Sequence, residues 1–109
     1  MLLDHLNDGE REVVRRALEG SLRFLFEPYG EVEYSLRMGL DSAVVRAMVA
    51  RLAETGDLAD DYVGRRAVNN SFNELLNGLG ISEAECLTAL GVARAEALRI
   101  YRTLSRSVG

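Results

Sequence analysis

Four asparagines on one predicted helix are the side chains of this 109-residue chain best suited to recognition chemistry. Asn69, Asn73 and Asn77 stand at i, i+4 and i+8 and so form one line along a helix, with Asn70 beside it. Asparagine is a poor helix former, and four of them cost helix propensity without an obvious local return. An uncharged hydrogen-bonding surface suits a protein partner better than DNA. The residues leave a second interpretation open, in which Asn77 caps the helix end before Gly78 and the others bond locally.

Arginine is the other residue type that points to recognition, because all 13 basic residues are arginines. Arg94, Arg99 and Arg102 near the C-terminus, and Arg46 in the first half, are candidates for contacts with DNA phosphates or guanine edges. The formal net charge of −4 argues against non-specific affinity for nucleic acid. Arginines late in a C-terminal helix also complement the helix dipole, and this interpretation stays open.

Catalytic and metal-binding residues are scarce. His5 is the only histidine and Cys86 the only cysteine, so a usual zinc site cannot be assembled, and a nucleophile would lack a well-placed base. We therefore expect no enzyme, no metal and no cofactor. The glutamates occur in two repeated pairs expected at helix starts, where acids favour the dipole: Glu31 with Glu33, and Glu83 with Glu85.

The elements that would position these residues occur twice. Residues 15–26 align with 65–76 at an offset of 50, and residues 31–52 align with 83–104 at an offset of 52. Such a period marks a duplicated supersecondary unit. We expect one domain over 1–109 with internal repeats at about 7–53 and 57–107 that share a core, because half of the chain buries too little surface alone. Ser21 and Ser71 align on the apolar side of the long helices, where small residues permit close packing.

Each repeat is predicted to run from a long helix through a short helix and a glycine turn to another long helix. In the first repeat, Asn7 and Glu10 form a capping box at the helix start, and Pro28 and Gly30 end that helix. A short second helix ends at Met38, and Asp41 caps the third helix.

The second repeat is predicted to follow the same plan. Asp57 aligns with Asn7 as the helix start, within a solvated acidic linker that also holds Glu54, Asp60 and Asp61. Ser82 and Glu85 form another capping box. Since nothing alternates with period two, the sequence predicts an all-α fold of six helices and no sheet.

Gly39 and Gly91 stand at the turn position of a helix-turn-helix, with apolar packing residues around each. Over about 20 residues per repeat, the pattern resembles the helix-turn-helix family, except that bulky Leu87 occupies a close-approach position. The resemblance implies two tandem tri-helical units. The run Asn70-x-x-Asn73-Glu74-x-x-Asn77-Gly78 also resembles a motif of small uncharacterised bacterial proteins, which implies a domain type and no activity.

These observations predict a cytoplasmic, non-enzymatic interaction or regulatory module that binds a protein partner through helix faces, as an immunity protein or antitoxin does. The alternative is a DNA-binding transcriptional regulator that uses the last helix of the second unit. No apolar run reaches the roughly 20 residues of a membrane helix, and no secretory leader begins the chain.

Overall fold

All regular structure in residues 1–108 is helical, which confirms the predicted all-α class. The computed structural model describes the backbone of residues 1–108 and the side chains of residues 1–105. Two of the elements are single π-helical turns, η1 and η2. In chain order the elements are α1 (Asp8–Ser21), η1 (Leu22–Phe26), α2 (Glu27–Met38), α3 (Ser42–Thr55), α4 (Tyr62–Asn73), η2 (Glu74–Gly78), α5 (Glu83–Leu90) and α6 (Arg94–Val108).

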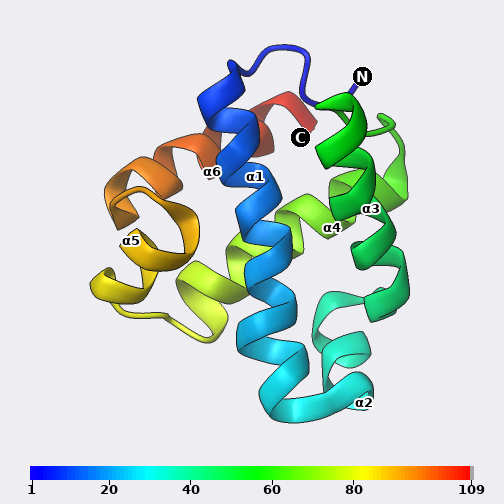
Figure 1. Ribbon diagram of the computed structural model, residues 1–109, viewed down its shortest axis with the longest axis vertical. Helices are drawn as coiled ribbons and strands as arrows, with labels where there is room; N and C mark the ends of the chain where they lie inside the picture. Colours follow the sequence, from blue (N-terminus) through cyan, green and yellow to red (C-terminus); the bar gives the residue numbers. More distant parts are fainter. Residues whose placement is uncertain (109) are drawn as a thin grey trace.

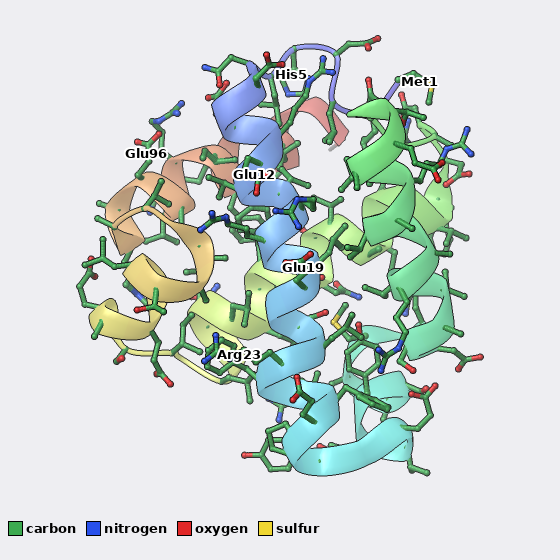
Figure 2. The ribbon with its side chains drawn as sticks, viewed as in Figure 1. Met1, His5, Glu12, Glu19, Arg23 and Glu96 are labelled. Atoms are coloured by element: carbon green, nitrogen blue, oxygen red, sulfur yellow. The ribbon has the colours of Figure 1, made fainter. Side chains whose placement is uncertain are left out.

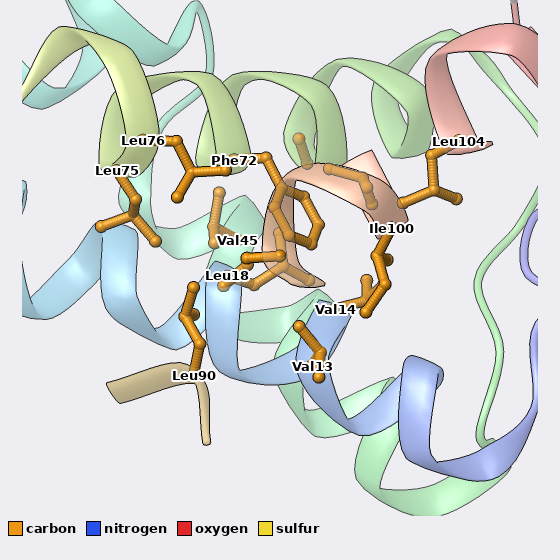
Figure 3. Packing of buried hydrophobic residues seen from close by; sticks show 14 of the residues in the cluster. Val13, Val14, Leu18, Val45, Phe72, Leu75, Leu76, Leu90, Ile100 and Leu104 are labelled. Carbon is orange, nitrogen blue, oxygen red and sulfur yellow. The ribbon is translucent and has the colours of Figure 1, made fainter. Parts of the chain in front are cut away.

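The long helices α1 and α4 cross at the centre of the molecule (Figure 1). Helix α1 packs against α3 of its own half and α5 of the other half, while α4 packs against α6 and α2 in the same manner. One core fills the space between them, and Val14, Leu18, Phe72 and Ile100 are among its fully buried members (Figure 3). The radius of gyration, 12.5 Å, is close to the value of about 13 Å for one domain of this length.

The described residues form five continuous helical segments, so the predicted number of six is wrong. Elements α1, η1 and α2 run on without a loop, and the chain turns only at Gly30, with φ 86° and ψ 177°. In the second half, by contrast, residues 79–82 separate η2 from α5. The offset of the sequence alignment changes from 50 to 52 between residues 76 and 83, where this loop lies. The first half therefore has fewer residues for a loop, and it bends at a conformation that is essentially restricted to glycine.

Local hydrogen bonds account for two of the predicted helix starts. At α1, Asn7 Oδ1 accepts from the Glu10 amide at 2.8 Å, and a Glu10 carboxylate oxygen accepts from the Asn7 amide at 3.0 Å. Ser82 and Glu85 form the same reciprocal pair at α5, with distances of 3.1 and 2.8 Å. Both predicted capping boxes are present.

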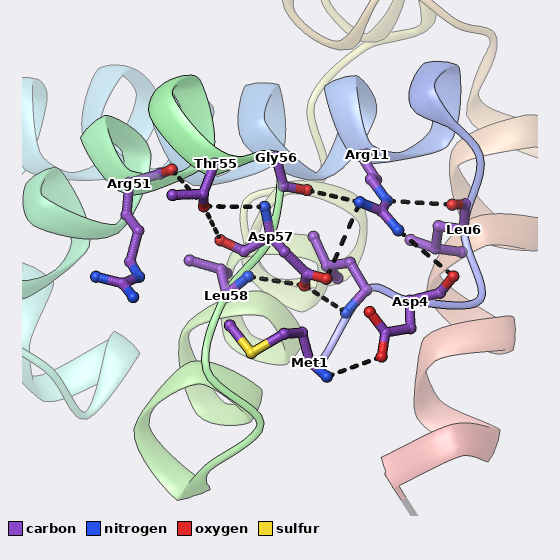
Figure 4. A network of polar contacts seen from close by, with 10 residues as sticks. Met1, Asp4, Leu6, Arg11, Arg51, Thr55, Gly56, Asp57 and Leu58 are labelled. Carbon is purple, nitrogen blue, oxygen red and sulfur yellow. Dashed lines mark hydrogen bonds and ion pairs between the residues drawn. The ribbon is translucent and has the colours of Figure 1, made fainter.

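The start of α4 differs from the prediction. Asp61, and not Asp57, caps this helix by accepting from the Gly64 amide at 2.8 Å. Asp57 is only 7% exposed, and its Oδ1 accepts from the amides of Leu3 and Leu58, both at 2.8 Å (Figure 4). The expectation that Asp57 belongs to a solvated linker is therefore wrong. The apolar N-terminal segment covers this part of the core, and Asp57 fixes it there.

The start of α3 also differs in its capping group. The Asp41 carboxylate accepts from Ser35 Oγ at 3.1 Å and makes no capping bond to the helix. Instead, Glu31 Oε1 accepts from the Ser42 amide at 3.1 Å. The second half repeats this arrangement, because Glu83 Oε1 accepts from the Arg94 amide at 3.1 Å. These glutamates thus join each short helix to the first turn of the next long helix, where a carboxylate favours the dipole.

Candidate interaction surfaces

The predicted line of asparagines lies on α4 and η2, away from the residues that α4 buries. Asn73 and Asn77 are exposed, and Asn77 Nδ2 donates to Asn73 Oδ1 at 3.1 Å. Asn69 is half-buried and donates to Asn70 Oδ1 at 3.1 Å. Asn70 Nδ2 donates to the Met38 carbonyl at 2.7 Å, at the end of α2. Two of the four asparagines are therefore open to a partner, and Asn70 instead holds the two halves together.

An arginine and an aromatic ring lie beside these asparagines, and the sequence did not indicate that they line one groove with Asn69 and Asn70. Tyr62, Arg65, Arg66, Asn69 and Asn70 line a groove on the outer side of α4. Arg66 Nη1 donates to the Tyr62 hydroxyl, and its guanidinium carbon lies 5.4 Å from the centre of the Tyr62 ring. Such contacts between arginine and an aromatic ring are attractive through the ring quadrupole.

Two of the four candidate DNA-binding arginines, Arg94 and Arg99, form hydrogen bonds or ion pairs with other residues of the chain. Arg94 donates to the carbonyl of Ile81 at 2.8 Å and to that of Leu76. Arg99 forms ion pairs with Glu10 at 2.8 Å and Glu96 at 2.5 Å. The hydrogen bond from Arg99 holds the pKa of Glu96 below its ordinary value.

The other two candidate arginines are exposed, as Arg99 is. Arg102 lies on α6, and the guanidinium of Arg46 lies 4.8 Å from the centre of the Phe26 ring. A phosphate at Arg94 or Arg99, by contrast, would have to compete with the internal partners of these arginines.

The short helix α2 presents a third surface, made of apolar side chains. Tyr29, Val32 and Leu36 are exposed, whereas Tyr34 and Met38 of the same helix are fully buried. Val32 and Leu36 are one turn apart and lie on the side opposite Tyr34, because two residues correspond to about 200° around a helix. The hydrophobic residues of α2 thus face both the core and solvent.

Groups suited to metal binding are not gathered in the part of the chain whose side chains the structure describes. Among the described residues, no group of three or more His, Cys, Asp or Glu side chains is placed so that it could hold a metal ion. Cys86 is fully buried, and burial raises the pKa of its thiol, which favours the protonated and unreactive form. Over the same part of the molecule, every helix is too short or too polar to cross a bilayer.

Comparison of the chain with protein-family models, with curated proteins and with solved structures finds no match. The function of the chain is therefore inferred from these surfaces.

Proposed function

We propose that this protein is a non-enzymatic interaction module that binds a protein partner through the outer face of α2. The observation that carries the proposal is the exposure of Tyr29, Val32 and Leu36, whose exposed fractions are 58, 77 and 75%. Burying a valine or leucine side chain in an interface is favourable by about 1.5–3 kcal/mol. Large exposed apolar side chains on one helix face, such as Val32 and Leu36, are typical of protein interaction sites.

The corresponding helix of the second half indicates that this apolar face is not needed for folding. At the offset of 52, Val32 corresponds to Ala84 and Leu36 to Thr88, both exposed on α5. The fold therefore accepts a small or polar residue at these two positions. Large apolar residues at the same positions of α2 add nothing to the core, and a partner that covers them accounts for their presence.

The proposal is tested by capturing partners from an extract of the cells that encode the protein, with and without nuclease. The wild type is compared with Val32→Asp/Leu36→Asp and with the matched control Ala84→Asp/Thr88→Asp. All substituted side chains are exposed, so each variant should show the helical circular dichroism of the wild type. We expect a protein partner that survives nuclease, is retained by the α5 control and is lost from the α2 variant.

Equal capture by both variants would contradict the proposal. Capture that disappears with nuclease would favour the alternative of a nucleic-acid-binding regulator.

A further inference from the structure

The two halves carry corresponding pairs of arginines whose surroundings differ. Arg15 and Arg16 on α1 align with Arg65 and Arg66 on α4 at the offset of 50. Each pair lines a groove on the outer side of its long helix. Arg16 lies against Gly91, which ends α5, and Arg66 lies against Gly39, which ends α2. Both glycines have a left-handed backbone, and each belongs to the half opposite its arginine. A Cβ atom added at Gly91 would lie 2.9 Å from Arg16, and one added at Gly39 would lie 2.3 Å from Arg66.

In the first half, carboxylates of the same helix neutralise the arginines. Glu12 pairs with both Arg15 and Arg16, and Glu19 pairs with Arg15. Both glutamates lie along the outer side of α1 (Figure 2). The hydrogen bond from Arg15 holds the pKa of Glu12 below its ordinary value, as expected for a carboxylate that is ionised beside an arginine.

In the second half, both of these carboxylates are replaced. Tyr62 stands at the position of Glu12, and Asn69 stands at the position of Glu19. Arg66 consequently pairs with no carboxylate among the described side chains, and its buried Nε has no hydrogen-bond partner there. Arg65 keeps one ion pair, with Asp60 at 2.7 Å, in which both side chains are nearly half exposed. An exposed pair of this kind contributes little and exchanges readily with another anion.

We propose that the groove formed by Tyr62, Arg65, Arg66 and Asn69 binds a carboxylate side chain of an acidic segment on the protein partner. This inference rests on the proposed function for the existence of that partner, and it adds the chemistry by which the partner is recognised. Arginine offers planar pairs of donors that match a carboxylate, and Asn69 adds an amide. Tyrosine and arginine are also the side chains most enriched at the energetic centres of protein interfaces.

The surroundings of the groove favour an isolated carboxylate over nucleic acid. Asp60 and Asp61 directly precede α4, and Asp41 follows Gly39, against which Arg66 lies. These acids would repel the successive phosphates of a DNA or RNA strand more strongly than a single carboxylate, which carries one negative charge.

The experiment is a titration of the full chain followed by heteronuclear NMR of the arginine Nε–H resonances, assigned with single Arg→Lys variants. The probe is an acetylated, amidated triglutamate, and inorganic phosphate and a short DNA duplex serve as competing probes. We expect saturable shifts at Arg65 and Arg66 with dissociation constants on the order of millimolar, and smaller shifts at Arg15 and Arg16.

Exchanging the residues that distinguish the halves supplies the matched variants. Tyr62→Glu/Asn69→Glu introduces the carboxylates of the first half at the same spacing and should weaken peptide binding about tenfold or more. Glu12→Tyr/Glu19→Asn should create peptide-dependent shifts at Arg15 and Arg16. Both variants leave the apolar face of α2 unchanged, so their effects are separate from those of Val32→Asp/Leu36→Asp.

Three results would overturn the proposal. The first is an absence of shifts at Arg65 and Arg66 in the wild type at saturating peptide. The second is unchanged binding by Tyr62→Glu/Asn69→Glu. The third is a stronger response to phosphate or to the DNA duplex than to the peptide, which would assign the groove to phosphate groups. Partner capture that depends on α2 would stand in each case.

Discussion

Two aligned serines should respond in opposite ways to the same substitution. Ser21 and Ser71 are both fully buried on the long helices. Ser21 Oγ donates to the Leu18 carbonyl at 2.7 Å and lies 2.9 Å from the Tyr34 hydroxyl. Ser71 Oγ has no hydrogen-bond partner among the described residues. The difference arises because the residue aligned with Tyr34 in the second half is Cys86, which has no hydroxyl to offer.

The magnitudes follow from what each substitution leaves unpaired. Ser21→Ala leaves the hydroxyl of Tyr34 without this partner in a fully buried site, and a buried group left unsatisfied costs about 1–3 kcal/mol. Ser71→Ala removes a hydroxyl that is already unsatisfied, so the free energy of unfolding should stay constant or rise by up to about 1 kcal/mol. The two variants should therefore differ by roughly 1–4 kcal/mol.

Urea unfolding followed by far-ultraviolet circular dichroism measures this difference, provided that the slope m is the same in all variants. The thermal midpoint of Ser21→Ala should fall by about 4 °C or more. Adding Tyr34→Phe to Ser21→Ala removes the orphaned hydroxyl and should recover part of the loss, which a double-mutant cycle quantifies. Equal destabilisation by the two serine substitutions, or a larger loss for Ser71→Ala, would refute the reasoning.

Four further substitutions test other parts of the fold. Gly39→Ala should cost about 1–2 kcal/mol because its φ is +71°, and it should also shift the NMR resonance of Arg66 Nε, which lies 2.3 Å from the added Cβ position. Gly30 has φ +86°, and nothing lies within 4 Å of a Cβ atom added there. Gly30→Ala should therefore destabilise the protein through backbone strain alone and leave the Arg66 Nε resonance unchanged. Asp57→Ala removes the acceptor of two backbone amides and should cost about 2–4 kcal/mol in urea unfolding, with faster hydrogen exchange in the N-terminal segment. The Asn7 amide and Arg99 hold the pKa of Glu10 below its ordinary value of 4.5, so its contribution to stability is complete above pH 4.5 and is lost as pH falls through the lower folded pKa. Glu10→Gln should make stability less dependent on pH in this acidic range, and an unchanged pH dependence would contradict that assignment.

The parts of the fold that the sequence predicted correctly depend on contacts close together along the chain. The capping boxes at Asn7 and Ser82 involve residues three positions apart, and the turns at Gly39 and Gly91 depend on the left-handed backbone of one residue. The incorrect prediction for Asp57 depends on a distant partner. The burial of Asp57 follows from the position of the N-terminal segment, which no local pattern specifies.

The candidate surfaces were predictable to a similar extent. The sequence indicated the line of asparagines, but it could not show that Asn70 would bond to the Met38 carbonyl of the other half. The groove was missed because it depends on how Arg66 lies against Gly39. A signal was nevertheless present in the alignment, since Tyr62 and Asn69 replace two glutamates that stand near arginines on the same helix.

The two proposed surfaces both lie near the C-terminal end of α2, which bears on how one partner could use both. Arg66 of the groove lies against Gly39, and Gly39 follows Leu36 of the apolar face by three residues, about 4.5 Å along the helix axis. Asn70 Nδ2 fixes the same end of α2 to α4. A single partner segment of modest length can therefore cover apolar side chains on α2 and place a carboxylate between the arginines of α4. If one segment does so, the effects of Leu36→Asp and Asn69→Glu on partner binding should be non-additive, because loss of either contact releases the other. Strictly additive effects would indicate two independent partners.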